Sequence, residues 1–248
     1  MKTCLLIPCY NTSKTLPKLF RALDKLSPQP TMTFFLENNS RDDTLWQIQK
    51  HYKHKPHKTL RIWFRDDAAQ ICRSVYEPIA HVRQLLLTAA RKYDPDYAIF
   101  LDADVYPISP NLITILTSHN KDIVGGSYVR LFPEGPFLAS KWPVPDNPKL
   151  HRFFRVPYAE LMEPVMTSAG CLCLSRRIIR DRRVNFWPLY SLEASEDFGY
   201  CLSARDFGYK VFLDGTAVLW HDVASVSRSK PWTRSRETNR YLPFKFND

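Results

Sequence analysis

Two aspartates, Asp102 and Asp104, end the apolar segment IFLDADVY at residues 99–106. In an extended chain, residues two apart point to the same side, so both carboxylates can face one ligand. Mg²⁺ and Mn²⁺ take carboxylate oxygens and leave other positions to water and phosphates. The spacing predicts a divalent metal site; the alternative is a turn in which Asp102 caps the backbone and Asp104 is solvated.

Two further polar groups follow or precede apolar segments late in the chain. His221 and Asp222 follow the run VLW, and an imidazole there is either a structural hydrogen-bonding group or a metal ligand that suits Mn²⁺ better than Mg²⁺. The acids Glu196 and Asp197 come directly before FGYCLSA, which has helical spacing. Negative charge at a helix N-terminus, with Ser195 as a cap, also has a purely structural explanation.

Strands and helices alternate over the first hundred residues. Strands are predicted over 3–9, 32–36, 60–64 and 97–101, and helices over 12–26, 42–52 and 77–92. Four such steps predict a parallel sheet with helices on both faces, whose ligands bind beyond the carboxyl ends of the strands. Polar residues follow all four strands there: Tyr10 and Asn11, Glu37 to Asn39, Asp66 and Asp67, and Asp102 with Asp104.

The second half of the chain has a less regular pattern. We expect a helix over 112–116, a strand over 122–129 and a long ordered loop in the proline-rich stretch 132–148. Strands are then predicted over 152–158, 167–174, 209–213 and 217–220, with a helix over 198–206. Residues 222–248 are basic and polar, which is typical of a tail or flap.

Composition narrows the class of protein. The 248 residues are 44% hydrophobic and 24% charged, which excludes disordered and collagen-like chains. The net charge of +10 favours an anionic partner. Six dispersed cysteines without a CxxC pair predict free thiols and a reducing compartment. Because neither a signal peptide nor a membrane span is recognisable, we expect a soluble, cytoplasmic protein.

Four segments together resemble one family. LIPCYNT, LENNSRDDT, FLDADVYP and SEDFGYCLSARDFGYKV occur in the order seen in nucleotide-sugar glycosyltransferases of the GT-A fold, family 2 type. The resemblance implies an α/β, Rossmann-like, mostly parallel sheet with helices on both faces and a small antiparallel acceptor-side extension. It also implies one domain over 1–221, with a nucleotide-binding half at 1–108 and an acceptor half at 109–221.

The resemblance also implies a reaction. A sugar would pass from a nucleotide-diphosphate sugar to a hydroxyl of a glycan, glycoprotein or lipid-linked acceptor, with Mn²⁺ or Mg²⁺ as cofactor and inversion at the anomeric carbon. Peripheral membrane contact is compatible with it, and no nucleic-acid partner is expected. The run Glu37-Asn38-Asn39 departs from the family, which has two acids and a glycine there.

Carried over by motif, the resemblance assigns three groups of residues. The catalytic residues are Asp197 as general base and Glu196 as its reserve or as an acceptor-orienting group; the metal ligands are Asp104, His221 and Asp102; the donor contacts are Pro8, Tyr10, Asn11, Glu37, Asp67, Arg83, Asp102, Ala103 and Gly170. For Asp67 and Arg83 an ordinary surface charge is the alternative. Aromatic residues of the second half, Trp187 among them, are candidates for stacking on the acceptor, and core packing is the alternative for each of them.

Three other functions compete with this interpretation. A nucleotidyltransferase could use a similar sheet and metal carboxylates but would release pyrophosphate. A basic nucleic-acid-binding protein would explain the net charge, although its basic and aromatic residues do not form a recognisable module. A sugar-nucleotide-binding relative without catalytic activity would keep every motif.

Overall fold

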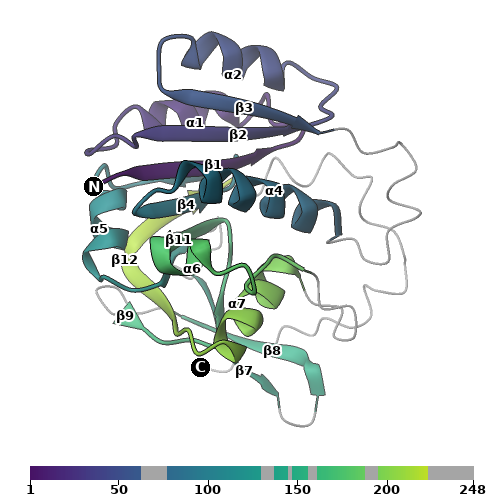
Figure 1. Cartoon of the computed structure of the whole chain (residues 1–248), viewed down its shortest axis with the longest axis vertical. Helices are drawn as coiled ribbons and strands as arrows, with labels where there is room; N and C mark the ends of the chain where they lie inside the picture. Colours follow the sequence, from purple (N-terminus) through teal and green to yellow (C-terminus); the bar gives the residue numbers. More distant parts are fainter. Residues whose placement is uncertain (63–76, 130–136, 145–146, 156–160, 188–194, 223–248) are drawn as a thin grey trace.

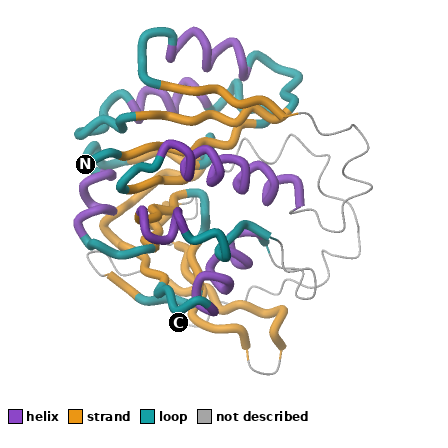
Figure 2. The backbone as a smooth tube through the Cα atoms, viewed as in Figure 1, coloured by secondary structure: helices purple, strands orange, loops and turns teal. Residues whose placement is uncertain are grey.

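A single mixed sheet forms the centre of the molecule, and helices cover both of its faces (Figures 1 and 2). The structure is a computed structural model that describes residues 1–62, 77–129, 137–144, 147–155, 161–187 and 195–222, of which 137–155 are described by their backbone alone. The strands are β1 (Thr3–Cys9), β2 (Met32–Asn38), β3 (His57–Ile62), β4 (Tyr97–Leu101), β5 (Val105–Pro107), β6 (Ile123–Val129), β7 (Phe137–Val144), β8 (Asn147–Arg155), β9 (Leu161–Met162), β10 (Met166–Thr167), β11 (Cys171–Ser175) and β12 (Val211–His221). The helices are α1 (Leu16–Leu23), α2 (Thr44–Tyr52), α4 (Glu77–Tyr93), α5 (Leu112–Ser118), α6 (Arg176–Arg180) and α7 (Glu196–Asp206).

The sheet has a parallel part and a mixed part. Its order is β10-β7-β6-β11-β4-β1-β2-β3, and β12 lies beside β6, β5 and β9. Strands β4, β1, β2 and β3 are parallel neighbours, whereas β11 runs antiparallel to both β4 and β6. The predicted fold class is thereby confirmed, and β11 is the strand at which the parallel arrangement ends.

The core lies in two layers because side chains alternate along each strand. Cys4 and Leu6 of β1 face the layer that packs on α4, α6 and α7, whereas Leu5 and Ile7 face the layer that packs on α1, α2 and α5. All seven residues of β1 are buried. A central strand that is covered on both faces needs apolar side chains at successive positions, and the sequence of β1 is such a continuous apolar run.

Two regions of the second half differ in detail from the sequence predictions. The proline-rich stretch 132–148 is not wholly a loop: β7 and β8 pair antiparallel across it, with register shifts on both sides of Pro143 that accommodate a residue without an N–H donor. The strands predicted at 209–213 and 217–220 are one strand, β12, with a register shift between Asp214 and Val218. The Asp214 carboxylate accepts hydrogen bonds from the Thr216 backbone and hydroxyl, which holds this irregularity in place.

Smaller differences concern helix and strand ends. Helix α1 begins at Leu16 and not at residue 12, with Thr15 as its N-cap residue and Pro17 in its first turn. The predicted strand 167–174 is divided into β10 and β11, and α6 was not predicted. The break between β10 and β11 contains Ala169 and Gly170.

The cysteines are free thiols wherever the structure describes them. Cys4, Cys9, Cys171, Cys173 and Cys201 are buried and unpaired, as predicted, and Cys72 lies outside the described residues. Burial raises the pKa of the Cys4, Cys171 and Cys201 thiols to about 12. These cysteines therefore stay protonated and act as small apolar core residues.

Candidate active site

The loops after β1 and β2 are joined by side chain to backbone hydrogen bonds. Asn11, at φ 50°, accepts a bond from the Arg41 backbone N–H at 2.8 Å, and its own N–H donates to Ser40 Oγ at 3.0 Å. Glu37 is 1% exposed and accepts bonds from the Ser40 N–H at 2.5 Å and Arg61 Nε at 3.2 Å. The predicted donor contacts Asn11 and Glu37 therefore also fix the shape of this edge of the sheet.

The other predicted contacts on this edge differ in accessibility. Tyr10 is 40% exposed at the carboxyl end of β1, where a ligand can reach its ring. Pro8 is buried within β1. Asp67 lies outside the described residues, so its predicted contact with the base has no structural counterpart here.

Arg83 of α4 is buried at the centre of a charged network. The guanidinium donates from Nη2 to both oxygens of Asp102 at 2.9 and 3.1 Å, and from Nε to Glu196 Oε1 at 2.9 Å. Nη1 donates to the carbonyl of Ala169 at 3.0 Å. Burial alone lowers the pKa of Arg83, but the adjacent carboxylates outweigh it and the pKa is raised. The alternative of an ordinary surface charge is therefore wrong, because Arg83 is buried and joins β4, α7 and the β10–β11 connection. Its contact with donor phosphates stays a prediction.

Asp102 and Asp104 have different surroundings, although they are two residues apart. The Asp102 carboxylate is committed to Arg83, and its N–H donates to the Gly170 carbonyl at 3.0 Å. Enclosure raises the pKa of Asp102, against the opposing charge of Arg83. Asp104 Oδ2 lies 3.5 Å from Nε2 of His221, because β12 pairs antiparallel with β5 and brings His221 beside Val105.

The Asp104–His221 pair has unused polar atoms. Both side chains are about one-fifth exposed, and His221 Nδ1 is buried without a hydrogen-bond partner among the described residues. A carboxylate beside an imidazole is a donor set that Mn²⁺ accepts. In the described part of the chain no three acidic, histidine or cysteine side chains converge as a metal cluster, so these two residues are the ligands that the geometry offers.

Asp222 follows His221 and has its own partners. Its carboxylate accepts bonds from Lys18 Nζ at 2.6 Å and from the Tyr106 hydroxyl at 3.3 Å, and its N–H donates to the Asp104 carbonyl at 2.9 Å. These bonds hold the end of β12 against α1 and the Asp104 turn. Asp222 thus positions the backbone on both sides of the pair.

The acids at the start of α7 have separate environments. Asp197 Oδ1 accepts bonds from the Ser195 hydroxyl and from the Phe198 N–H at 2.8 Å, and Oδ2 accepts one from the Ala169 N–H at 3.3 Å. Asp197 is partly exposed, whereas Glu196 is 4% exposed and bound to Arg83. Burial and the neighbouring Asp197 charge raise the pKa of Glu196 to about 7. Only Asp197 is accessible to an acceptor hydroxyl.

Gly170 allows the close approach of two side chains. A Cβ at this position would lie 2.9 Å from the Tyr128 hydroxyl and 3.0 Å from Asp102 Oδ2, so a larger residue would displace one of them. Tyr128 is 1% exposed, and its hydroxyl lies beside the Ser168 side chain without a well-formed hydrogen bond to any described residue. The absence of a side chain at Gly170 is therefore a condition for the position of Asp102.

The structure brings most of the predicted residues to one region. Arg83, Asp102, Glu196, Asp197 and Gly170 are joined through hydrogen bonds that include both backbone groups of Ala169. Asp104 and His221 form the adjacent pair. The side chain of Tyr128 was not predicted. It has no motif of its own, and only its contact with Gly170 in the folded chain indicates it.

Known proteins provide an independent comparison. The family model described as glycosyl transferase family 2 matches residues 4–183, and the chain therefore belongs to this family. The prediction of a family 2 glycosyltransferase is confirmed at that level. No helix in the described part of the chain is long and apolar enough to cross a membrane.

Among curated proteins, procollagen galactosyltransferase 1-A of Xenopus laevis is 32% identical over 128 residues. The match covers 46% of this chain and 21% of that protein, so the chain spans about a fifth of this relative's length.

Two solved structures have the same fold. GalNAc-T7 with UDP, GalNAc and Mn²⁺ superposes with a TM-score of 0.63 at 14% identity, covering 89% of this chain and 44% of the other. Residues 1–349 of S. aureus TarS with UDP-GlcNAc give 0.59 at 17% identity, covering 89% and 58%. These likenesses concern the fold.

Proposed function

We propose that the protein transfers a sugar from a nucleotide-diphosphate sugar to a hydroxyl acceptor, with a divalent metal ion and with inversion of the anomeric carbon. The observation that carries the proposal is that one hydrogen-bonded network links an open carboxylate–imidazole pair, Asp104 and His221, to the accessible carboxylate of Asp197. Asp197 accepts a bond from the Ala169 N–H, Arg83 donates to the Ala169 carbonyl, and Arg83 also holds Asp102, two residues before Asp104. The UDP, UDP-GlcNAc and Mn²⁺ bound to the two structural neighbours support this class of donor and cofactor.

Asp104 and His221 are the residues that would hold the metal ion. A bound divalent cation neutralises the negative charge that develops on a departing diphosphate. No hydrogen bond to a described residue holds Nδ1 of His221, so the pairing of β12 with β5 sets the orientation of the imidazole. Such a ring is free to take a metal ion as its partner. Asp102 has both oxygens on Arg83, so we assign it to positioning this edge of the sheet and not to metal binding.

Asp197 would act as the general base. A carboxylate within hydrogen-bond reach of an acceptor hydroxyl can take its proton as the oxygen attacks the anomeric carbon. The Ser195 hydroxyl and the backbone N–H groups of Phe198 and Ala169 hold the carboxylate in one orientation. Glu196 is withheld from this role by burial and by its bond to Arg83, and serves as a positioning residue.

The first experiment is a thermal-shift screen with UDP-, GDP-, dTDP- and CDP-sugars, each with Mn²⁺, Mg²⁺ or EDTA. Binding to the native state raises the melting temperature, so a shift that requires both a nucleotide sugar and a metal ion supports the proposal and identifies the base. A shift with oligonucleotides alone would contradict it.

Donor turnover then tests the chemistry. Release of nucleoside diphosphate is the expected product, whereas release of pyrophosphate would indicate a nucleotidyltransferase. Asp197→Asn should lower transfer by about 10² to 10⁴-fold with little change in donor binding. Asp206→Asn, an exposed acid at the other end of α7, is the matched control and should retain full activity.

A further inference from the structure

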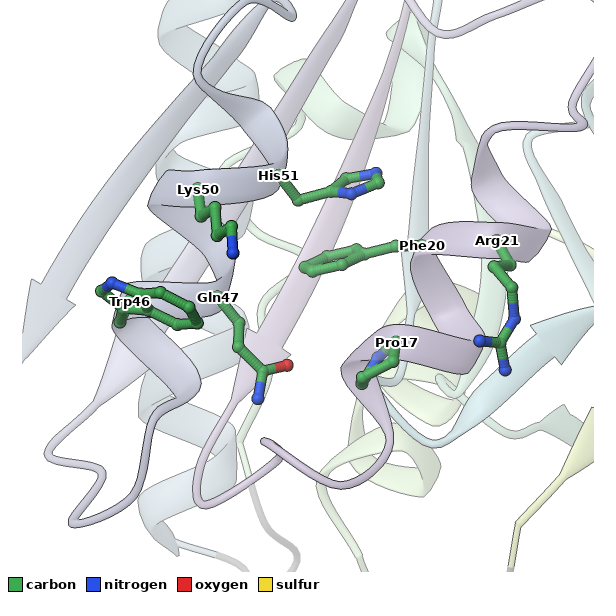
Figure 3. Close-up of a pocket in the computed structure, with 7 residues that line it drawn as sticks. All are labelled: Pro17, Phe20, Arg21, Trp46, Gln47, Lys50 and His51. Atoms are coloured by element: carbon green, nitrogen blue, oxygen red, sulfur yellow. The ribbon is translucent and has the colours of Figure 1, made fainter.

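A groove of about 440 Å³ lies between α1 and α2, apart from the residues of the candidate active site. Figure 3 shows the side chains that line it, which are Pro17, Phe20, Arg21, Trp46, Gln47, Lys50 and His51. In Figure 1 the two helices lie beside β1, β2 and β3 at one end of the molecule, and α7 lies toward the other end. The volume is in the range of small-ligand pockets.

Helix α2 presents to this groove residues that the core does not use. Its buried residues are Thr44, Ile48 and Tyr52, spaced four apart on one face. Trp46 and Lys50, also four apart, lie on another face, with Lys50 Nζ 4.6 Å from the centre of the indole ring. Trp46 is 58% exposed, the only large hydrophobic side chain so exposed in α1 and α2. Packing of the fold therefore does not explain this tryptophan.

The charge of the groove is one-sided. Arg21, Lys50 and His51 are basic, and none of the seven lining residues is acidic. His51 lies 3.2 Å from the Asp24 carboxylate. Among the described residues, neither Arg21 nor Lys50 has a carboxylate partner. Two cations without a counter-ion beside an exposed indole form a site for an anion that also has an apolar surface.

The base of the groove is formed by stacked and hydrogen-bonded side chains. Phe20 is 5% exposed and stacks on the His51 ring at 4.3 Å between centres with 7° between planes. Gln47 Nε2 donates to the Ser13 carbonyl at 3.0 Å. This bond fixes the amide against the loop before α1.

We propose that this groove binds an acidic carbohydrate chain. One sugar ring lies with its apolar C–H face on the Trp46 indole, and carboxylate or sulfate groups lie at Lys50 and Arg21. A single exposed aromatic residue in a concave, basic site fits a ring with charged substituents better than a lipid surface, which would contact several protruding apolar side chains. The inference goes beyond the proposed function, because binding here does not require donor turnover.

The test is isothermal titration of the full chain with hyaluronan and chondroitin sulfate tetrasaccharides, and with chitotetraose as a neutral probe of the same length. At least one acidic tetrasaccharide should bind at physiological ionic strength, and chitotetraose should bind at least tenfold more weakly. Trp46→Ala and Lys50→Gln should each weaken acidic binding tenfold or more. Lys53→Gln, an exposed lysine next to α2 that does not line the groove, should change it by less than twofold.

Several results would overturn this site. They are the failure of both acidic probes, equal loss in Lys50→Gln and Lys53→Gln, or unchanged binding in Trp46→Ala. Binding of phosphatidylserine vesicles or of polyglutamate that depends on Trp46, in place of tetrasaccharide binding, would also reject it. The thermal shift with nucleotide sugars is measured on the same wild-type sample. If tetrasaccharides bind but nucleotide sugars do not, the result counts against the proposed function. If nucleotide sugars bind but tetrasaccharides do not, it counts against the groove.

Discussion

Two charged clusters at the carboxyl end of the sheet differ in how many of their polar atoms have partners. Around Arg83, the guanidinium nitrogens and both Asp102 oxygens are hydrogen bonded, and the arginine is 4% exposed. In the Asp104–His221 pair the closest approach is 3.5 Å, both side chains reach solvent, and Nδ1 has no described partner. A saturated network can hold the shape of the chain, whereas an unsaturated pair can bind something else.

This difference separates effects on activity from effects on stability. Side chains of the open pair contribute little to folding, so changing them should impair binding and catalysis in a protein that still folds. Side chains of the saturated network hold three elements together, so changing them should first lower the free energy of unfolding.

The largest expected effect is on activity and concerns Asp104. Asp104→Asn should lower transfer by about 10³-fold or more, because stabilisation of a leaving diphosphate through a metal ion is worth several kcal/mol. The free energy of unfolding without ligands should change by less than about 1 kcal/mol. Steady-state rates and urea denaturation measure both quantities.

His221 gives the matched histidine comparison. His221→Gln should weaken metal-dependent donor binding, whereas His54→Gln, at an exposed position after α2, should not. If Asp104→Asn kept more than a tenth of the activity, or if it unfolded the protein, the contrast between the two clusters would be lost.

Stability is the quantity most affected at Arg83. Arg83→Met leaves Asp102 and Glu196 without their shared cation in a buried place, and should lower the free energy of unfolding by about 3–5 kcal/mol. Adding Glu196→Gln should restore part of this loss, since one uncompensated carboxylate is then removed. Urea denaturation of the single and double variants measures the recovery.

Arg177→Met is the control for that experiment. Arg177 pairs with Asp122 at 2.9 Å, but its side chain is 73% exposed, so its loss should cost at most about 1 kcal/mol. Equal costs at Arg83 and Arg177 would mean that the buried network contributes no more than an exposed ion pair.

The sequence predicts the parallel part of the fold better than the mixed part. Strands β1 and β4 were predicted with the observed bounds, because apolar runs between polar loops report burial on both faces of a parallel sheet. β7 was missed, the strand predicted over 152–158 overlaps β8 only at its end, and β12 was predicted as two strands. Pro143 and the residues from Asp214 to Thr216 suggest breaks where the chain in fact makes irregular pairs. Local patterns do not report such tertiary pairing.

The candidate site divides in the same way. Asp102, Asp104, Glu196, Asp197 and His221 were found because acids or imidazoles at the ends of apolar segments are visible in sequence. Their partners were not: nothing local indicates that Arg83 bonds to Asp102 and Glu196 rather than to a ligand, since these residues are 19 and 113 positions away. The roles of all these residues stay predictions until variants are measured.

A smaller effect on stability should come from the ionisation of Glu196. Burial and Asp197 raise its pKa to about 7, so the folded chain holds this proton more tightly than the unfolded chain. The contribution to stability is full below about pH 4.5 and is lost as pH rises toward 7, with an upper bound of about 3 kcal/mol. Wild-type stability should therefore fall between pH 5 and pH 8 by more than that of Glu196→Gln.

The comparison uses differences so that other titrating groups cancel. The change in unfolding free energy between the two pH values is measured for wild type, Glu196→Gln and Glu163→Gln. Glu163 is an exposed acid paired with Lys210, and its variant should follow the wild type. The same pH dependence in all three proteins would show that Arg83 keeps Glu196 ionised over the whole interval.

The smallest expected effect tests how closely the saturated network is packed. Gly170→Ala should cost about 1–3 kcal/mol, because its Cβ would lie 2.9 Å from the Tyr128 hydroxyl and 3.0 Å from Asp102 Oδ2. Tyr128→Phe should cost at most about 1 kcal/mol, since the hydroxyl that it removes has the Ser168 side chain beside it but makes no well-formed hydrogen bond. In the Tyr128→Phe background the alanine should cost less, which urea denaturation of the four proteins measures. If Gly170→Ala lowered the free energy of unfolding equally in wild type and in Tyr128→Phe, the clash would involve Asp102 alone. The alanine would then directly disturb the hydrogen bonds between Asp102 and Arg83.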